Sequence, residues 1–436
     1  MQLFLKTVAA SFFIIPAFCG TGLAQDVSIS AETTQTQVEQ EFQANEKRAK
    51  RGYREAQFKT GQAYATGNGV TKDPVKAFEW LEKAANQGHV EASADIADIY
   101  EKGNGTVQDS VKALEWLEKA ANRGHTESQL ALAKRYEKGL GVEPDEKKAF
   151  RWLEKAARKD REAQYQLALS YQEGKNGTQP NIQQAIRFYR QAAEQKHVSA
   201  QIRLGQIYSK GADKIRKNPA ESVKWYRKAA EEHDSPLAQA YMGVAYHFGF
   251  GVEQDHSLAR EWYLKAAGQN QRLAQNNLGV LYALGQGVQK DYKQASYWYR
   301  KAADQNFREA QHNLGHLYEK GLGVPANTEQ AFFWYNKSAA QGFAPAQFSL
   351  GLLHYREGLN TNDRRKAVEW FKKAAEQGEV TSQYSLGLLY LNGSTILPKD
   401  QNIAQMWLQR AADQGSQNAQ LKLKELKTSQ EVSLAN

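Results

Sequence analysis

The stretch Leu273-Ala-Gln-Asn-Asn-Leu-Gly-Val-Leu-Tyr282 decides the fold of this chain, because it recurs ten times together with the segments that follow it. A glycine-containing turn ends at Val288, and a second segment runs from Asp291 to Asp304 around an aromatic anchor. Successive anchors are 36 or 37 residues apart. A motif of this length buries its apolar face against copies of itself, so the period predicts a solenoid and not a globular enzyme. The ten anchors are Trp80, Trp116, Trp152, Phe188, Trp225, Trp262, Trp298, Trp334, Trp370 and Trp407.

Each first segment has the pattern of a helix that packs closely on a neighbour. Ala274, Leu278 and Tyr282 are spaced by four residues, which places them on one helix face. The residue after Leu278 is Gly279, and all ten copies have Gly or Ala there. A glycine inside a helix costs about 1 kcal/mol relative to alanine. Its repeated use therefore predicts that another helix lies against this position.

Each second segment has a clear start. All ten copies carry Asp or Asn four residues before the alanine that recurs in this segment, as Asp291 precedes Ala295. These side chains accept hydrogen bonds from the free N–H groups of a first helical turn, so they predict helix N-caps. A metal site is the poorer interpretation, because each copy supplies one such residue and no partner ligand. The ten positions are Asp73, Asp109, Asp145, Asn181, Asn218, Asp255, Asp291, Asn327, Asp363 and Asp400.

The turns and the basic residues also repeat. Turns such as Gly321-Leu-Gly323-Val324 follow a helix, whereas a phosphate-binding loop follows a strand, so we expect them to end helices. A Lys or Arg stands three residues after nine of the ten anchors. That ladder could attract nucleic acid, but at the end of each second helix it complements the helix dipole, so we expect no nucleic-acid partner.

The N-terminus reads as a secretory signal. Lys6 precedes an apolar run from Thr7 to Phe18, and Gly22-Leu-Ala24 fits a cleavage site before Gln25. An uncleaved anchor or lipidation of Cys19, the only cysteine, are the alternatives. We therefore expect an exported chain, periplasmic or secreted, with no transmembrane segment after cleavage. The net charge of +9 is modest for 436 residues and excludes little.

The pattern Ala-x-x-x-Leu-Gly-x-x-Tyr, Gly-x-Gly-Val, Asp-x-x-x-Ala-x-x-Trp-Tyr-x-Lys-Ala-Ala-x-Gln-Gly resembles the Sel1-like repeat, an α/α hairpin related to tetratricopeptide repeats. The resemblance implies an all-α, right-handed superhelical solenoid of about ten 36–37-residue hairpins with helical caps. We expect a signal peptide at 1–24, a disordered linker at 25–35 and a capping helix at 36–55. Ten repeats then cover 56–416, and a capping helix with a tail covers 417–436.

The resemblance further implies that first helices line a concave face. At these positions the early copies are polar, with Asp98, Glu101 and Lys134, whereas the last copies are apolar. An apolar stripe marks a partner site, although tight curvature would instead bury the same side chains. We predict a non-enzymatic scaffold that binds a protein or peptide partner, with no cofactor. The predicted partner-binding residues are Phe348, Leu352, Tyr355, Tyr384, Leu388, Leu391, His312 and His316.

Other functions fit the sequence less well. His312 and His316 have the i, i+4 spacing of a metal pair, but Asn313 stands where the familiar zinc motif has glutamate, so we predict no metal. Cysteine-rich repeat proteins of Helicobacter resemble this chain and have been linked to β-lactam hydrolysis, but their cysteine pairs are absent here. Binding of cell-envelope glycan by stacking on aromatic side chains is a further alternative.

Overall fold

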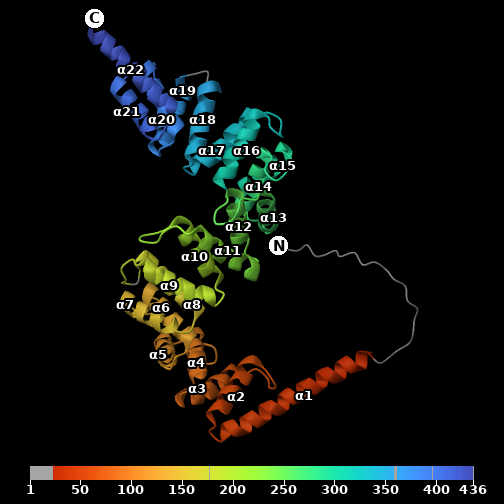
Figure 1. Cartoon of the computed structure of the whole chain (residues 1–436). Helices are drawn as coiled ribbons and strands as arrows, with labels where there is room; N and C mark the ends of the chain where they lie inside the picture. The colour runs from red at the N-terminus through yellow and green to blue at the C-terminus, as the bar shows by residue number, and fades with distance from the viewer. Residues whose placement is uncertain (1–22, 176, 358–360, 395, 436) are drawn as a thin grey trace, which may run out of the picture. The chain divides into compact units, whose positions relative to one another are not determined.

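In the computed structural model, residues 23–175, 177–357, 361–394 and 396–435 are described, with side chains from 35 to 428. The described residues form paired helices joined by short turns, and they contain no β-strand beyond one isolated bridge between Ala212 and Ile215 (Figure 1). The predicted all-α solenoid of helical hairpins is therefore confirmed. The first helices are α2 (Arg54–Thr66), α4 (Val90–Lys102), α6 (Thr126–Lys138), α8 (Arg161–Glu173), α10 (Val198–Lys210), α12 (Pro236–Phe248), α14 (Arg272–Leu284), α16 (Arg308–Lys320), α18 (Ala344–Glu357) and α20 (Val380–Asn392). The second helices are α3 (Pro74–Asn86), α5 (Ser110–Asn122), α7 (Glu146–Ala156), α9 (Ile182–Glu194), α11 (Pro219–His233), α13 (His256–Gly268), α15 (Tyr292–Asp304), α17 (Thr328–Ala340), α19 (Thr361–Glu376) and α21 (Gln401–Asp413).

One further helix stands at each end. The helix α1 (Leu23–Lys50) precedes the first hairpin, and α22 (Gln417–Ala435) follows the last one. The helix α1 includes residues 25–35, for which the sequence predicted disorder; no proline or glycine interrupts that stretch. Phe42 of α1 packs edge-on against Tyr64 of α2, with ring centroids 5.4 Å apart. Apart from Leu23 and Ala24, the predicted signal peptide lies outside the described residues.

The described helices fall into two compact units, one up to Phe188 and one from Tyr189 onward. Within each unit, hairpins are adjacent in chain order, because each helix packs mainly on the helices before and after it. Helix α9 contains the boundary between the two units. Among the described helices, none is both long and apolar enough to cross a membrane.

The predicted N-caps are confirmed in nine copies. The Asp291 carboxylate, for example, accepts from the backbone N–H groups of Lys293 at 2.8 Å and Gln294 at 3.1 Å. Asp363 is the exception, and its prediction was wrong: α19 already includes Thr361, so Asp363 lies inside the first turn. Its carboxylate there lies 4.0 Å from His354 Nδ1. An acid in the first turn still complements the helix dipole, which is why the residue type persists without the cap.

The close approach predicted at the small residue is also confirmed. A Cβ added to Gly279 would lie 2.5 Å from the ring of Tyr299, the residue after the anchor Trp298. The same contact joins Gly243 to Tyr263 and Gly315 to Tyr335. The residue after each anchor thus packs directly on the first helix of its own hairpin. This contact fixes the two helices of a repeat at a short distance.

The anchor itself joins successive repeats. Trp334 is 3% exposed and packs into one core with Tyr299 of the preceding second helix and Leu314 of its own first helix. Trp116 and Trp407 occupy the same place in their own cores. Several anchors are only half-buried, Trp298 among them. The anchor therefore contributes to the contact between neighbouring repeats, which no isolated hairpin could make.

Candidate functional site

A ladder of glutamines holds each repeat to the previous one. The Gln311 amide is 1% exposed and donates to the Ala303 carbonyl at 3.2 Å, at the end of the preceding second helix. The Gln311 oxygen accepts from Gln341 Nε2 at 2.7 Å, at the end of its own hairpin. The last carbonyls of a helix have no partner inside that helix. The ladder satisfies them, so these buried amides have a structural role and are not free to bind a ligand.

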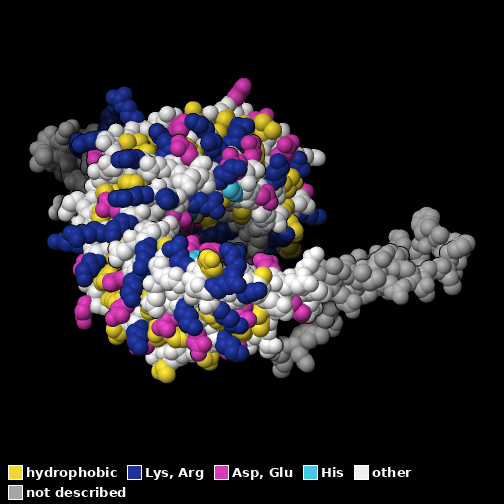
Figure 2. All heavy atoms as spheres, turned by 90° about the horizontal axis from the view of Figure 1, so that it is seen from below, with side chains coloured by type: hydrophobic (Ala, Val, Ile, Leu, Met, Phe, Trp, Pro, Cys, Tyr) yellow, Lys and Arg dark blue, Asp and Glu magenta, His cyan; other side chains and the backbone are white. Residues whose placement is uncertain are grey.

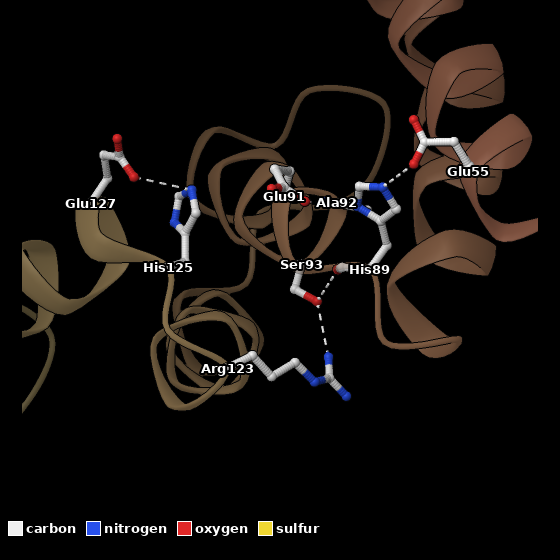
Figure 3. Close-up of polar contacts among 8 residues, drawn as sticks. All are labelled: Glu55, His89, Glu91, Ala92, Ser93, Arg123, His125 and Glu127. Carbon is white, nitrogen blue, oxygen red and sulfur yellow. Dashed lines mark hydrogen bonds and ion pairs between the residues drawn. The ribbon is translucent and has the colours of Figure 1, made fainter. Parts of the chain in front are cut away.

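One rung of this ladder has a different composition (Figure 3). Ser93 replaces the first glutamine and Arg123 the second, and Arg123 Nη1 donates to Ser93 Oγ at 3.3 Å. A short hydroxyl and a long guanidinium therefore span the distance that two amides span elsewhere. This pair also is structural.

Histidines at the repeat junctions cap first helices. His89 Nδ1 accepts from the Ala92 N–H and His125 Nδ1 from the Ser128 N–H, both at 3.3 Å. The other ring nitrogen of each histidine faces a carboxylate, Glu55 for His89 and Glu127 for His125, at 3.2 Å in both cases (Figure 3). The Glu91 carboxylate also lies 3.2 Å from His89 Nδ1, and Ser128 Oγ lies 2.9 Å from His125 Nδ1. These two junction histidines therefore have a structural role as N-caps of first helices.

The basic ladder lies on the tryptophans. A Lys or Arg three residues after each tryptophan places its cationic group 3.7–5.3 Å from the ring centroid, in all nine tryptophan copies. The shortest of these distances joins Lys119 and Trp116. Such cation–π contacts stabilise exposed sites by about 0.5–1 kcal/mol. On the face shown in Figure 2, basic and acidic side chains are interspersed, without one broad basic field.

The predicted apolar stripe lies on α18 and α20. Tyr355 is 51% exposed, whereas Phe348, Leu352, Tyr384 and the other apolar members are half-buried. Phe348 packs on Phe371, with ring centroids 5.6 Å apart, and Tyr384 packs against the last core. The stripe thus partly covers the cores of the last two repeats and partly faces outward. Leu388 and Leu391 are also half-buried, but only Leu391 of this pair belongs to the packing around those cores.

The two predicted histidines have different surroundings. His316 is exposed, whereas His312 is half-buried and its Nε2 lies 3.1 Å from Ser349 Oγ. The rings of Tyr335 and Phe343 lie 5.5 and 5.6 Å from the His312 ring. Burial, with a smaller contribution from the neighbouring His316, lowers the pKa of His312 to about 4. His312 is therefore a neutral part of the repeat packing at neutral pH.

The described residues hold no cluster of three His, Cys, Asp or Glu side chains able to bind a metal ion. The chemistry that the stripe offers is therefore contact with apolar and aromatic groups. Sequence reasoning missed the glutamine ladder, although the Ala-Gln and Gln-Gly pairs recur in the repeat. It also missed a cavity between α10, α11 and α12, because no single residue type marks it.

Comparison with known proteins places the repeat in a family. The Sel1 repeat matches ten consecutive segments, which together cover most of the chain. These are residues 54–89, 90–125, 126–160, 161–197, 198–234, 236–271, 272–307, 308–343, 344–379 and 380–416. A comparison with curated proteins found no match.

Two solved structures are similar over most of their length. One is c5321, described as a protective antigen present in uropathogenic Escherichia coli strains and displaying an SLR fold, with 37% identity and a TM-score of 0.73. The alignment covers 88% of this chain and 82% of that one. The other is a Sel1 repeat protein from Oxalobacter formigenes, with 25% identity, a TM-score of 0.55, and coverage of 82% and 95%. The chain belongs to the Sel1 repeat family.

Proposed function

We propose that this chain is an exported, non-catalytic scaffold that binds a protein partner through the first helices of its last two repeats. The observation that carries the proposal is the stripe itself: equivalent positions are polar in early copies and apolar in late ones, where Tyr355 is half exposed. A repeat array presents such positions at regular spacing from a rigid frame. An apolar row on a regular surface suits an extended or helical partner segment.

The test replaces stripe residues that the cores do not need. Tyr355→Lys with Leu388→Lys places charge on an exposed tyrosine and on a leucine outside the packing around the cores. The partner is first identified by affinity capture from envelope extract and then purified. We expect the variant to bind this partner at least tenfold more weakly than the parent chain in calorimetry. The matched control is Tyr297→Lys with Phe333→Lys, two aromatic residues of second helices that are 49% and 46% exposed.

Equal binding by both variants would contradict the proposed surface. Thermal melting should stay within a few degrees of the parent for both. The variant Leu352→Lys with Tyr384→Lys is the harsher version, because both residues also contact the cores. If that variant unfolds while the milder pair retains its fold and its partner, the stripe is core and not a binding site.

Export and the alternative activities are tested separately. The mature chain should begin at Gln25 by N-terminal sequencing after secretion. A retained Met1 in the membrane fraction would contradict cleavage and favour the uncleaved anchor. Turnover of nitrocefin by the purified chain, or its retention on purified sacculus, would favour the hydrolase or glycan-binding alternative over a protein scaffold.

A further inference from the structure

A cavity of about 610 Å³ near α1 is polar and acidic, whereas a cavity of about 330 Å³ between α10, α11 and α12 has mainly apolar walls. The second cavity lies wholly within the unit that begins at Tyr189. Tyr226 and Tyr241 form one wall with stacked rings whose centroids are 4.6 Å apart. Val244 and Phe250 contribute to the remaining wall, and Phe250 is 56% exposed at the mouth.

A small residue borders this cavity on one side. Ser209, on the last turn of α10, lines it and is exposed. One repeat later the equivalent residue is His247, which is 4% exposed and whose Nε2 lies 3.0 Å from Gln286 Oε1, a hydrogen-bond acceptor. The imidazole thus fills in the next repeat the place that the serine leaves open. The space between the neighbouring helices is accordingly available in one repeat and closed in the other.

The rim of the cavity is basic. Lys210 and Lys217 line it and are exposed, and the described side chains that form the cavity include no carboxylate. Neither lysine forms an ion pair with any residue that the structure describes. Lys210 precedes the turn Gly211-Ala-Asp-Lys-Ile-Arg-Lys217, and Lys217 ends it. This turn departs from the glycine pattern of most copies. The closed bridge between Ala212 and Ile215 shapes this turn beside the cavity.

Apolar walls under two unpaired cations define the chemistry of an occupant. A volume of about 330 Å³ lies at the small end of the range for ligand pockets, about 300–1,000 Å³, so it has room for one large side chain and not for a whole helix. Unpaired lysines at the mouth favour carboxylates next to that side chain. We propose that this cavity, called here the Tyr241 pocket, receives a single Phe or Leu of an acidic partner segment, with flanking Asp or Glu residues at Lys210 and Lys217. The proposal rests on the proposed scaffold function and gives it a second, more selective contact.

The probe is the peptide acetyl-Glu-Asp-Phe-Asp-Glu-amide, carrying a fluorophore, with the full mature chain in anisotropy titrations. We expect saturable binding that weakens at least tenfold when Phe becomes Ala, and that weakens as salt is raised from about 50 to 300 mM. A third peptide, acetyl-Gly-Gly-Phe with a free carboxyl end, tests the other source of carboxylate. Binding of that peptide alone would overturn the acidic segment as the occupant.

Three variants locate the binding. Ser209→His, copied from His247 one repeat later, should fill the Tyr241 pocket and abolish binding without loss of helicity. Lys210→Glu with Lys217→Glu should weaken binding at least tenfold, because both lysines are exposed and only their charge is reversed. The control Lys290→Glu with Lys293→Glu makes the same change of charge at exposed sites two repeats later, Lys290 being equivalent to Lys217.

Binding that is unaffected by Ser209→His, or reduced equally by the control, would overturn the pocket. So would the absence of saturable binding by the phenylalanine peptide. Neither result bears on the proposed binding by the stripe on α18 and α20. That proposal is tested with a different ligand, by the variant Tyr355→Lys with Leu388→Lys. The two failures are therefore distinguishable.

Discussion

At the scale of single residues, the packing of this repeat depends on two positions that contact each other, one on each helix of the hairpin. The sequence pattern predicts only the small residue of the first helix. Where the first helix has Gly279, the second helix presents the large ring of Tyr299, and where it has Ala97, the second helix presents Leu117. Ala133 and Leu153 form the same smaller pair in the next copy. Glycine at this position faces a large ring or, at Gly61 and Gly387, a leucine, whereas Ala97 and Ala133 face leucines. A close-packed interior has no room for both a Cβ at Gly279 and the ring of Tyr299.

This pair yields a rescue prediction. Gly279→Ala should lower the free energy of unfolding by about 1–3 kcal/mol, because its Cβ would lie 2.5 Å from Tyr299 and overpacking of this kind destabilises. Adding Tyr299→Leu, as in the Ala97–Leu117 pair, should recover at least half of that loss in urea titrations. The control is Gly268→Ala, which meets no atom within 4 Å and should be neutral or stabilise by up to about 1 kcal/mol. A double variant less stable than either single change would contradict the pair.

His312 gives a pH prediction at the same scale. Burial lowers its pKa from 6.5 to about 4 in the folded chain, so the unfolded chain takes up a proton that the folded chain resists. The stability due to neutral His312 is complete above pH 6.5 and falls as the pH drops toward 4, by up to about 3 kcal/mol. The variant His312→Asn introduces the residue that the seventh copy has at this position, Asn276. Its urea midpoint should change less between pH 7.5 and 4.5 than that of the parent chain. An equal pH response in the variant would show that His312 does not titrate as described.

At the scale of helices, the repeats are joined by polar as well as apolar contacts. The glutamine ladder gives carbonyls at helix ends a second hydrogen bond, in addition to the one each accepts from a backbone N–H. Loss of one partner from a buried hydrogen bond costs about 1–3 kcal/mol. The hydrogen bonding at each helix end thus depends on a side chain of the next repeat. The cation–π contacts on the tryptophans are a further polar contribution.

The Ser93–Arg123 rung allows this to be measured by a double-mutant cycle. Ser93→Gln or Arg123→Gln alone should destabilise, because one long and one short partner no longer match across the junction. Together they recreate the glutamine pair of the other copies, as in Gln341 and Gln311 at 2.7 Å. We expect a favourable coupling free energy of about 1 kcal/mol from chemical denaturation. Additive effects would mean that the two side chains act independently.

At the scale of the whole chain, stability should depend on the place of a repeat in the array. Trp334→Ala removes a side chain that is 3% exposed from a central core and should cost about 3–5 kcal/mol. Trp407→Ala, next to α22, should cost less, because an end repeat has fewer neighbours. Equal losses in fluorescence-monitored unfolding would contradict coupling between nearest neighbours only. Trp298 is half-buried, so its removal should cost less than removal of Trp334.

The period, the N-caps and the small residue could be read from the sequence because they are local and repeat ten times. The role of Asp363 could not, since α19 includes Thr361 and so places Asp363 inside the first turn. Nor could the burial of His312, which packs against Tyr335 and Phe343 about 23 and 31 residues later in the same repeat. The Tyr241 pocket is lined by residues of three helices and a turn, a combination that no motif marks.

The central claim, that first helices of the late repeats bind a protein, is tested most directly by site-specific photo-crosslinking in secreting cells. A benzophenone amino acid at Tyr355, on α18, should form one covalent protein adduct. The same group at Tyr297, on α15 and 49% exposed, should form none. Adducts of equal yield at both positions, or none at Tyr355 while the chain still captures its partner, would contradict the claim.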